Sequence, residues 1–472
     1  MSRAAVAVMG MGGIAERVAP LLRRLLAPVA LVAAAICFVP LARASLLVTN
    51  ATFLTMNPGE TAPVVGYMLV GDDGRIAALA AGAPPVGMSA TTTLDATSKI
   101  IIPGFISAHS HIWQSALRGL GADQYTPGWI SAVLVYSSRA TDEDLYWFSL
   151  HGALDHLLHG ITSAYNFGYN VRVGEYNGDQ LRALLDSGIR FVHAFAQPRS
   201  MPVEEHYQSF VRFYSVARPH LSAPKLLRLG FTGLRTTLAE AKLGKRLMGE
   251  FGVLNQTHYL EAPPDKEQEQ KLFQNFIDAD SLGPNLFFGH FIHTTDEILQ
   301  KTAAAGSGMS WQPLSNGRLA SGIADIPKYR SLGVKVGMGV DGQASADIAD
   351  AFENMRVGLY MLRAKYQDPS IMQPIEILRL HTLGSAEVMG IADKLGSLEV
   401  GKLADFNVIS VPTPVFDPAA SVVFACGTMN IDAVYVGGEK LVDHGELTRS
   451  DMARAASEVA TRVDRIRALA GK

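Results

Sequence analysis

The sequence predicts an α/β fold, a (β/α)8 TIM barrel joined to a small β-sandwich that is built from both ends of the chain. Three observations lead to this prediction. Short apolar runs alternate with amphipathic segments through the middle of the chain, which is typical of parallel strands connected by helices. There are eight such runs, the number that closes a barrel. The segments on either side have a different texture, with short strands and tight turns.

The barrel is predicted over residues 101–399. A chain of 472 residues can bury a core of this size with a smaller module beside it. Its 48% hydrophobic and 18% charged residues are typical of a globular protein. The expected strands, in chain order, are 101–108, 160–165, 190–195, 226–231, 252–258, 286–290, 308–311 and 334–341.

Two segments that flank the barrel are predicted to form one composite β-sandwich. Residues 45–100 contain the turn Gly71-Asp72-Asp73-Gly74, and residues 400–447 contain Gly437-Gly438. The last segment, 448–472, carries Ala, Val and Ile at helical spacing with Arg and Glu between them, so we expect a C-terminal helix on the surface.

The first 44 residues have the composition of a secretory signal peptide. Arg23-Arg24 precedes an uncharged apolar run, residues 25–41, and Ala42-Arg43-Ala44 offers a cleavage site. We therefore expect residues 1–44 to be removed and the protein to be exported, periplasmic or secreted, with no stable membrane association after cleavage. The alternative is an uncleaved anchor formed by residues 25–41.

Charge and cysteine content restrict the partners. The net charge of −3 gives no reason to expect a nucleic acid, so the expected partner is a small-molecule substrate, with a homo-oligomer left open. Removal of residues 1–44 would leave Cys426 as the single cysteine, which cannot form an internal disulfide. We expect Cys426 to be a packed small hydrophobe.

Polar side chains follow several of the expected barrel strands. His109 and His111 end the first strand, and side chains two residues apart in a strand point to the same face. Three later strands end in other groups that can bind a metal, namely His258, His290 and Asp341. Because the C-terminal ends of barrel strands converge on one face, the pattern predicts a metal site there.

The chain from about Ser45 onward resembles the amidohydrolase superfamily, specifically the deaminase and chlorohydrolase branch that includes enzymes acting on S-adenosylhomocysteine, guanine and triazines. The pieces that carry this resemblance are Pro103-Gly104-Phe105, His109-x-His111, Leu117-Arg118-Gly119-Leu120, His258-x-x-Glu261, His290-x-x-His293, Ser315-Asn316, Gly339-Val340-Asp341-Gly342 and the stretch from Gly396 to Phe406. The resemblance implies that one divalent metal is held by His109, His111, His258 and Asp341. It also implies that Glu261 and His290 act on the bound water and the substrate.

The donor set favours one zinc ion, with iron or manganese possible. Related enzymes with two metals use a carboxylated lysine at the end of the fourth strand, and here Leu226 to Phe231 continues into Thr232-Gly233 without one. The predicted catalytic residues are Glu261, His290 and Asp341. Asp341 is expected to accept the proton of a metal-activated water, Glu261 to protonate the leaving group, and His290 to stabilise the attacking oxygen.

The predicted reaction is hydrolysis of a carbon–nitrogen bond, most simply deamination of a nitrogen heterocycle. An amide or carbamate hydrolase, or a dechlorinase, is the alternative, because an activated water is indifferent to the leaving group. A non-catalytic binding protein is disfavoured because the metal ligands and the acid are intact. Candidate substrate-binding residues are the flat side chains of Trp113 and Trp311 and the amides of Gln114 and Gln312.

Two departures from the family weaken an assignment to S-adenosylhomocysteine or methylthioadenosine as the substrate. Relatives often read Ser-His-Asn-Pro-x-Ser-Asn after the seventh strand, where this chain has Trp311-Gln312 in place of the His-Asn pair. Adenosine-type deaminases carry a histidine near the end of the fourth strand, where this chain has Gly230-Phe231-Thr232-Gly233. The other histidines, His151, His156, His159 and His193 among them, are expected to be surface or packing residues.

Overall fold

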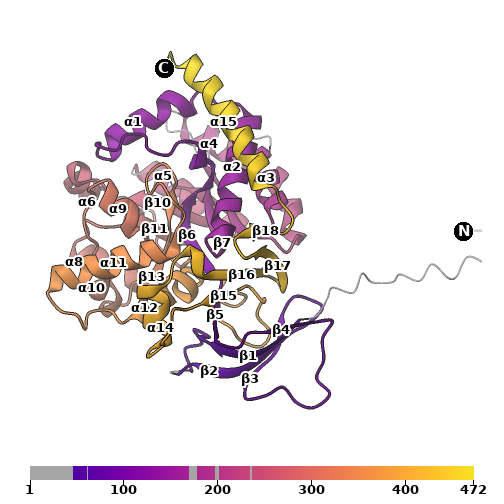
Figure 1. The fold of residues 1–472 in the computed structure, drawn as a ribbon. Helices are drawn as coiled ribbons and strands as arrows, with labels where there is room; N and C mark the ends of the chain where they lie inside the picture. Colours follow the sequence, from indigo (N-terminus) through magenta and orange to yellow (C-terminus); the bar gives the residue numbers. More distant parts are fainter. Residues whose placement is uncertain (1–45, 61, 169–177, 197–200, 234–236, 472) are drawn as a thin grey trace, which may run out of the picture. The chain divides into compact units, whose positions relative to one another are not determined.

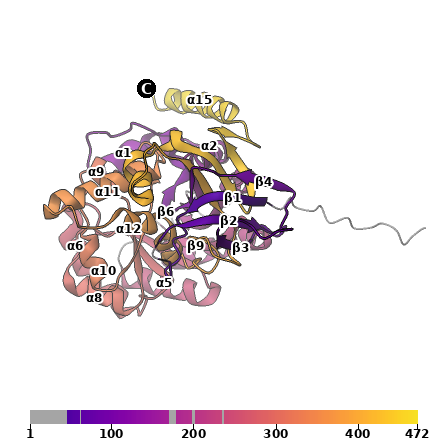
Figure 2. The ribbon, with the colours of Figure 1, turned by 60° about the horizontal axis from the view of Figure 1, so that its bottom comes forward.

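The computed structural model describes residues 46–60, 62–168, 178–196, 201–233 and 237–471. The chain divides into two compact units, residues 1–43 and 44–472, and all described residues belong to the second. Figures 1 and 2 show this unit from two directions, with the β1–β3 sheet in indigo and the C-terminal helix α15 in yellow.

Parallel strands form a barrel, as predicted. Their order is β13-β12-β11-β10-β9-β8-β7-β6-β14, and each neighbouring pair is parallel. The chain passes from β13 through two residues into β14, which pairs with β6 and closes the sheet. The bounds are β6 (Phe105–His111), β7 (Ile161–Phe167), β8 (Arg190–Ala196), β9 (Leu226–Thr232), β10 (Leu254–Tyr259), β11 (Leu286–His290), β12 (Gly308–Trp311), β13 (Lys335–Met338) and β14 (Asp341–Gly342).

Helices connect the barrel strands and cover them from outside (Figure 1). The helices in the barrel part of the chain are η1 (Ile112–Ala116), α1 (Thr126–Ser137), α2 (Asp142–Leu158), α3 (Asp179–Ser187), α4 (Val203–Ala217), η2 (Arg218–Ser222), α5 (Leu238–Phe251), η3 (Pro263–Asp265), α6 (Lys266–Leu272), α7 (Gln274–Asp278), α8 (Asp296–Ala304), α9 (Pro313–Arg318), α10 (Ile326–Ser331), α11 (Ala351–Tyr366), α12 (Pro374–Arg379), η4 (Leu380–Gly384) and α13 (Ser385–Val388). Further helices follow the barrel in the chain, namely α14 (Pro418–Ala420), η5 (Ser421–Ala425), η6 (Thr428–Asn430) and α15 (Met452–Leu469).

Local sequence sets where these helices begin and end. In α5, Thr237 and Glu240 form a capping box that satisfies free backbone amides at the first turn. The helix ends at Gly252, whose φ of 64° lies in the left-handed region that glycine adopts without steric cost. The chain can therefore reverse directly into β10, which carries His258 to the end of the barrel.

The second sheet is built from both ends of the described chain, as predicted. Its order is β18-β17-β16-β15-β5-β1-β2-β3, with β4 paired to β1. The antiparallel pair β5–β15 joins the two halves, with Asn407 opposite Ile102. The bounds are β1 (Leu46–Phe53), β2 (Val64–Val70), β3 (Ile76–Ala81), β4 (Thr92–Asp95), β5 (Lys99–Pro103), β15 (Phe406–Ser410), β16 (Ile431–Val436), β17 (Glu439–Asp443) and β18 (Glu446–Leu447).

A buried ion pair joins this sheet to the barrel. Arg190 Nε at the start of β8 donates to Asp405 Oδ2 at 2.7 Å, and both residues are almost fully buried. Asp405 also accepts from the backbone amide of Gly437 at 2.7 Å. Since a buried charge is tolerated only when it is paired and hydrogen-bonded, these contacts fix where β15 and β16 meet the barrel.

The helix α15 lies in the segment where a C-terminal helix was predicted. Val459 and Ile466 are buried in a cluster with Trp113, Trp129 and other residues of η1, α1 and α2. Arg462 and Arg465 form ion pairs with Asp144 on α2. The end of the chain thus supports the helices that follow the first barrel strand.

The predicted export of the protein is corrected. The predicted signal, residues 1–44, lies outside the described residues, so no structural feature supports it. In the described part of the chain no helix is long and apolar enough to cross a membrane. The alternative, a membrane anchor formed by residues 25–41, also lies outside the described residues, and neither prediction is carried further.

Candidate metal centre

Five of the predicted site residues meet at the C-terminal end of the barrel. His109 and His111 end β6, His258 lies near the end of β10, His290 ends β11, and Asp341 begins β14. Ligand atoms of His109, His258 and His290 lie within 4.8 Å of one another, and so do those of His109, His111 and Asp341. Strand ends that are far apart in sequence therefore present nitrogen and oxygen atoms to one point.

The distances among these atoms are short. His111 Nε2 lies 3.1 Å from His258 Nε2. Asp341 Oδ1 lies 3.3 Å from His109 Nε2 and 3.5 Å from His111 Nε2. These contacts bring His109, His111, His258 and Asp341 close together, and their assignment as the metal ligands stays a prediction.

Burial sets the charge state of these groups. It lowers the pKa of His111 to about 3, with a further contribution from His109, so this ring is neutral at physiological pH. Burial alone would raise the pKa of Asp341, but its interactions with His109, His290 and His111 hold it well below its usual range. The neutral ring of His111 and the ionised carboxylate of Asp341 are in the protonation states in which such groups bind metals.

The tautomer of His109 follows from Gln256, which the sequence analysis did not single out. Gln256 Nε2 donates to the carbonyl of Ala108 at 2.8 Å, and Gln256 Oε1 lies 2.7 Å from His109 Nδ1. An amide oxygen only accepts, so Nδ1 carries the ring proton and Nε2 carries a lone pair.

A cation fits this arrangement. His109 Nε2 is buried and has no hydrogen-bond partner among the described residues, although an ionised carboxylate lies 3.3 Å away. A lone pair that faces a carboxylate without a proton between them is costly, and a cation bound by both removes the cost. Three imidazoles and one carboxylate suit a single divalent ion of the zinc class.

Two consecutive residues of α9 orient the groups beside this centre. Ser315 Oγ donates to Asp341 Oδ2 at 2.6 Å, which leaves Oδ1 for the histidines. Asn316 Nδ2 lies 2.8 Å from His290 Nδ1, and an amide NH2 group only donates, so His290 carries its proton on Nε2. That Nε2–H lies 3.8 Å from Glu261 Oε2 and 4.0 Å from Asp341 Oδ2.

Glu261 is buried beside the same centre. It is 3% exposed, and its Oε1 accepts a hydrogen bond of 3.1 Å from Thr126 Oγ1 at the start of α1. Its other oxygen, Oε2, is the one that faces His290. The contact with Thr126 was missed in the sequence because a single threonine at the start of a helix carries no recognisable signal.

An aromatic side chain also borders the centre. The ring centroid of Phe167, at the end of β7, lies 4.5 Å from that of His258, 4.8 Å from that of His111 and 5.5 Å from that of His109. An apolar residue at the end of a buried strand looks in sequence like ordinary core, so nothing distinguished Phe167.

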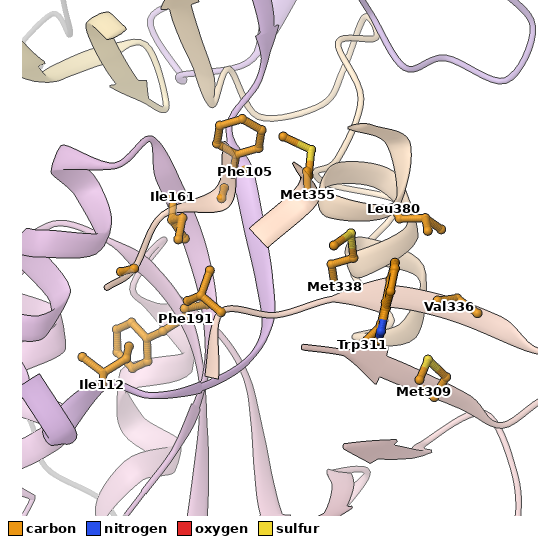
Figure 3. Packing of buried hydrophobic residues seen from close by; sticks show 14 of the residues in the cluster. Phe105, Ile112, Ile161, Phe191, Met309, Trp311, Val336, Met338, Met355 and Leu380 are labelled. Atoms are coloured by element: carbon orange, nitrogen blue, oxygen red, sulfur yellow. The ribbon is translucent and has the colours of Figure 1, made fainter. Parts of the chain in front are cut away.

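The four candidate substrate-binding residues lie in different surroundings. Trp113 is buried in the cluster under α1, and Gln114 is 4% exposed with its Oε1 unpartnered among the described residues. Trp311 is 1% exposed and lies against Met338, Met309 and Val336 in the core (Figure 3).

Gln312 hydrogen-bonds to the protein through both ends of its amide. Its Nε2 donates to Ser310 Oγ at 2.7 Å, and its Oε1 accepts from the backbone amide of His290 at 3.0 Å. Gln312 thus holds the backbone of His290, which has a positive φ of 68°. Contact of these four residues with a substrate stays a prediction.

Comparison with known proteins gives one family match and a set of full-length relatives. The model of the Amidohydrolase family matches residues 100–441. The 5-methylthioadenosine/S-adenosylhomocysteine deaminase of Desulforudis audaxviator is 28% identical over 407 residues, covering 80% of this chain and 90% of the relative. The 5'-deoxyadenosine deaminase of Methanosarcina barkeri is 25% identical over 446 residues, covering 89% of this chain and all (100%) of the relative.

Solved structures show the same fold. An adenosine deaminase from Xanthomonas campestris with bound zinc superposes with a TM-score of 0.78 at 20% identity, covering 90% of this chain and 98% of the other. The atrazine chlorohydrolase of Arthrobacter aurescens TC1 in complex with zinc gives a TM-score of 0.78 at 22% identity, covering 89% and 100%.

Proposed function

This chain belongs to the amidohydrolase family, as its motifs indicated, and on that premise we propose that it deaminates a nitrogen heterocycle by hydrolysis with one zinc ion. It is a metal-dependent hydrolase of carbon–nitrogen bonds, and its substrate is a small molecule. The observation that carries the proposal is the grouping of ligand atoms at the strand ends. His109 and His111 face Asp341 Oδ1, and His258 Nε2 lies 3.1 Å from His111 Nε2. Glu261 lies beside the same group, 3.8 Å from His290 Nε2.

Three imidazole nitrogens and Asp341 Oδ1 would hold the ion. When bound, the ion would lower the pKa of a water to about 7, which would supply a nucleophile at neutral pH. A second metal would need a bridging ligand, and β9 ends at Thr232 without a lysine. The proposal is therefore a mononuclear site.

Asp341 and His290 act on the attacking oxygen. Asp341 is ionised and deeply buried, so it can accept the proton that the water gives up. His290 carries its proton on Nε2, on the side of Asp341 and Glu261, so it can donate a hydrogen bond to the oxygen as negative charge builds. Asn316 keeps that proton in place.

Glu261 is the residue that transfers protons to the ring nitrogen and to the leaving amine. Thr126 occupies Oε1, so Oε2, which faces His290, is the oxygen available for proton transfer. Protonation of a ring nitrogen and then of the departing amine would release ammonia, with the oxygen of water remaining on the ring. Atoms balance with water as the only co-reactant.

Relatives support a six-membered nitrogen heterocycle with an exocyclic amino group. Those named above are called deaminases of adenosine-type compounds, and a structural neighbour acts on a triazine. We therefore propose an aminopurine or a related aminated ring as the substrate class. A homo-oligomer stays a prediction, which light scattering would test.

The test is ammonia release by the purified zinc-loaded chain. The panel is adenosine, 5'-deoxyadenosine, S-adenosylhomocysteine, guanine, cytosine and melamine, with atrazine followed by chloride release and simple amides and carbamates followed by acid formation. The expected result is ammonia release from at least one ring compound by the wild type, with much slower release by Glu261→Gln. Turnover confined to atrazine, amides or carbamates would reject deamination and keep the hydrolase.

A further inference from the structure

We propose that Gln256 is a positioning residue that keeps His109 in its metal-binding tautomer and thereby sets the affinity of the centre for zinc. The inference rests on the proposed metal site, because it concerns how strongly that site binds its ion. It adds a residue that contacts neither the proposed ion nor a substrate, and whose effect can be measured without knowing the substrate.

Both ends of the Gln256 amide form hydrogen bonds within the protein. The side chain is fully buried in β10 (0% exposed), and its Nε2 donates to the carbonyl of Ala108 at 2.8 Å. A carbonyl oxygen cannot donate, so the amide cannot be turned around without losing this bond. Gln256 Oε1 must then face His109 Nδ1, 2.7 Å away, and accept a hydrogen bond from the Nδ1–H group.

The same amide spans the barrel. β6 and β10 are not neighbours in the sheet, since β7, β8 and β9 lie between them. Gln256 and His258 lie two residues apart on β10 and share a face, so one strand supplies a ligand and also the partner of a ligand on β6. Gln256 therefore sets the distance between two proposed ligands as well as the tautomer of one of them.

Without this acceptor, the population of the other His109 tautomer, with its proton on Nε2, would increase. Asp341 Oδ1 lies 3.3 Å from His109 Nε2 and would attract a proton to that nitrogen. A proton there occupies the position of the metal, so zinc would have to displace it. Gln256 opposes this by holding the proton on Nδ1. Loss of such an outer partner typically costs 10–100-fold in metal affinity.

Three variants of the full chain separate this role from simple packing. Gln256→Met keeps the size of the side chain but removes the acceptor and the donor. Gln256→Glu keeps an acceptor for His109 Nδ1, adds a negative charge and loses the bond to Ala108. Thr257→Val is the matched control, because Thr257 is equally buried on the same strand and its hydroxyl donates to the carbonyl of Gly233 at 2.9 Å.

The measurement is the affinity for Zn2+ of the apo-protein, by competition with a chromophoric chelator, with folding followed by circular dichroism. We expect a loss of about 10–100-fold for Gln256→Met, a loss smaller than about tenfold for Gln256→Glu, and no change for Thr257→Val. An unchanged affinity in folded Gln256→Met overturns the inference. Equal losses in the folded Met and Glu variants also overturn it, since the acceptor would then not matter.

The wild-type chain separates this inference from the proposed function. If the wild-type chain fails to bind Zn2+, both the metal site and the inference are rejected. If the wild type binds one zinc tightly and Gln256→Met binds zinc with the same affinity, only the inference is rejected. If both Gln256 variants fail to fold, a crystal structure of the zinc-loaded wild type decides the matter. Ligation through His109 Nε2 with the Gln256 contact kept is expected, and ligation through Nδ1 would overturn it.

Discussion

Ser315 Oγ donates a hydrogen bond of 2.6 Å to Asp341 Oδ2, and this contact decides which oxygen of the carboxylate faces the histidines. Oδ1 is left toward His109 and His111, at 3.3 and 3.5 Å. The next residue, Asn316, holds His290 in the same way. One short helix, α9, thus orients two proposed catalytic groups that belong to different strands.

Removal of the Ser315 hydroxyl should therefore impair both the stability and the activity of the enzyme. In Ser315→Ala the buried carboxylate loses a hydrogen bond of a kind worth about 1.5–3 kcal/mol. We expect the free energy of unfolding to fall by up to this amount and turnover to fall roughly tenfold, since Asp341 is free to rotate. Urea unfolding and steady-state kinetics measure both, with exposed Ser331→Ala as the control. Wild-type turnover in Ser315→Ala would contradict the orienting role.

The number of metal ions per chain is the second prediction. Four ligands without a bridging lysine should bind one zinc, so elemental analysis of the purified protein should give about one ion per chain. His258→Ala removes one of three imidazoles and should abolish metal binding and activity together. A reproducible value of two ions per chain would reject the mononuclear site.

Glu261→Gln tests the proton carrier. The amide keeps the size of the side chain but cannot shuttle protons, so turnover should fall by roughly 10²–10⁴-fold. Because Glu261 is not among the proposed ligands, metal content and thermal unfolding should stay close to wild type. Near-normal activity in this variant would leave Asp341 or His290 as the proton carrier.

Thr126 should act only through Glu261. Thr126→Val removes the donor to Oε1 at almost constant size and should lower turnover with little change in KM, whereas Thr126→Ser keeps the hydroxyl and should restore most of it. In a Glu261→Gln background Thr126→Val should have no further effect, because the two residues form one unit. Additive losses in the double variant would show that Thr126 has a role of its own.

Stability should fall as the pH drops from about 6.5 towards 4. Burial lowers the pKa of His193 to about 3 and the pKa of His156 and His381 to about 4, so in this range the unfolded chain binds protons that the folded chain refuses. Each group contributes a slope of about 1.4 kcal/mol per pH unit. Urea unfolding between pH 7 and 5 measures the total.

Replacing one of these histidines measures its contribution to the pH dependence of stability. His381→Gln can keep contacts to the carbonyl of Ile106 and to Asn354, and it cannot titrate. Its slope of stability against pH should be smaller than that of the wild type by about 1.4 kcal/mol per pH unit. An unchanged slope would mean that His381 titrates alike in the folded and unfolded chains.

The sequence by itself determined the barrel, the shared sheet and the grouping of the metal ligands. These follow from local rules: apolar runs alternate with helices, and His109 and His111 lie on one face because the strand pleat repeats every two residues. Asp341 and His290 could be placed because parallel strands in a barrel all end at one face.

Only the tertiary structure decided which side chains orient these ligands. Gln256 meets His109 from 147 positions away, and Ser315 meets Asp341 from 26 positions away. Trp311, a candidate substrate-binding residue, lies in the core beside Met338, and its ring packs against α11, where Gly358 leaves room for it. Such pairings depend on how the barrel closes and how each helix packs back onto it. No local pattern of residues encodes the distance between side chains that are so far apart in sequence.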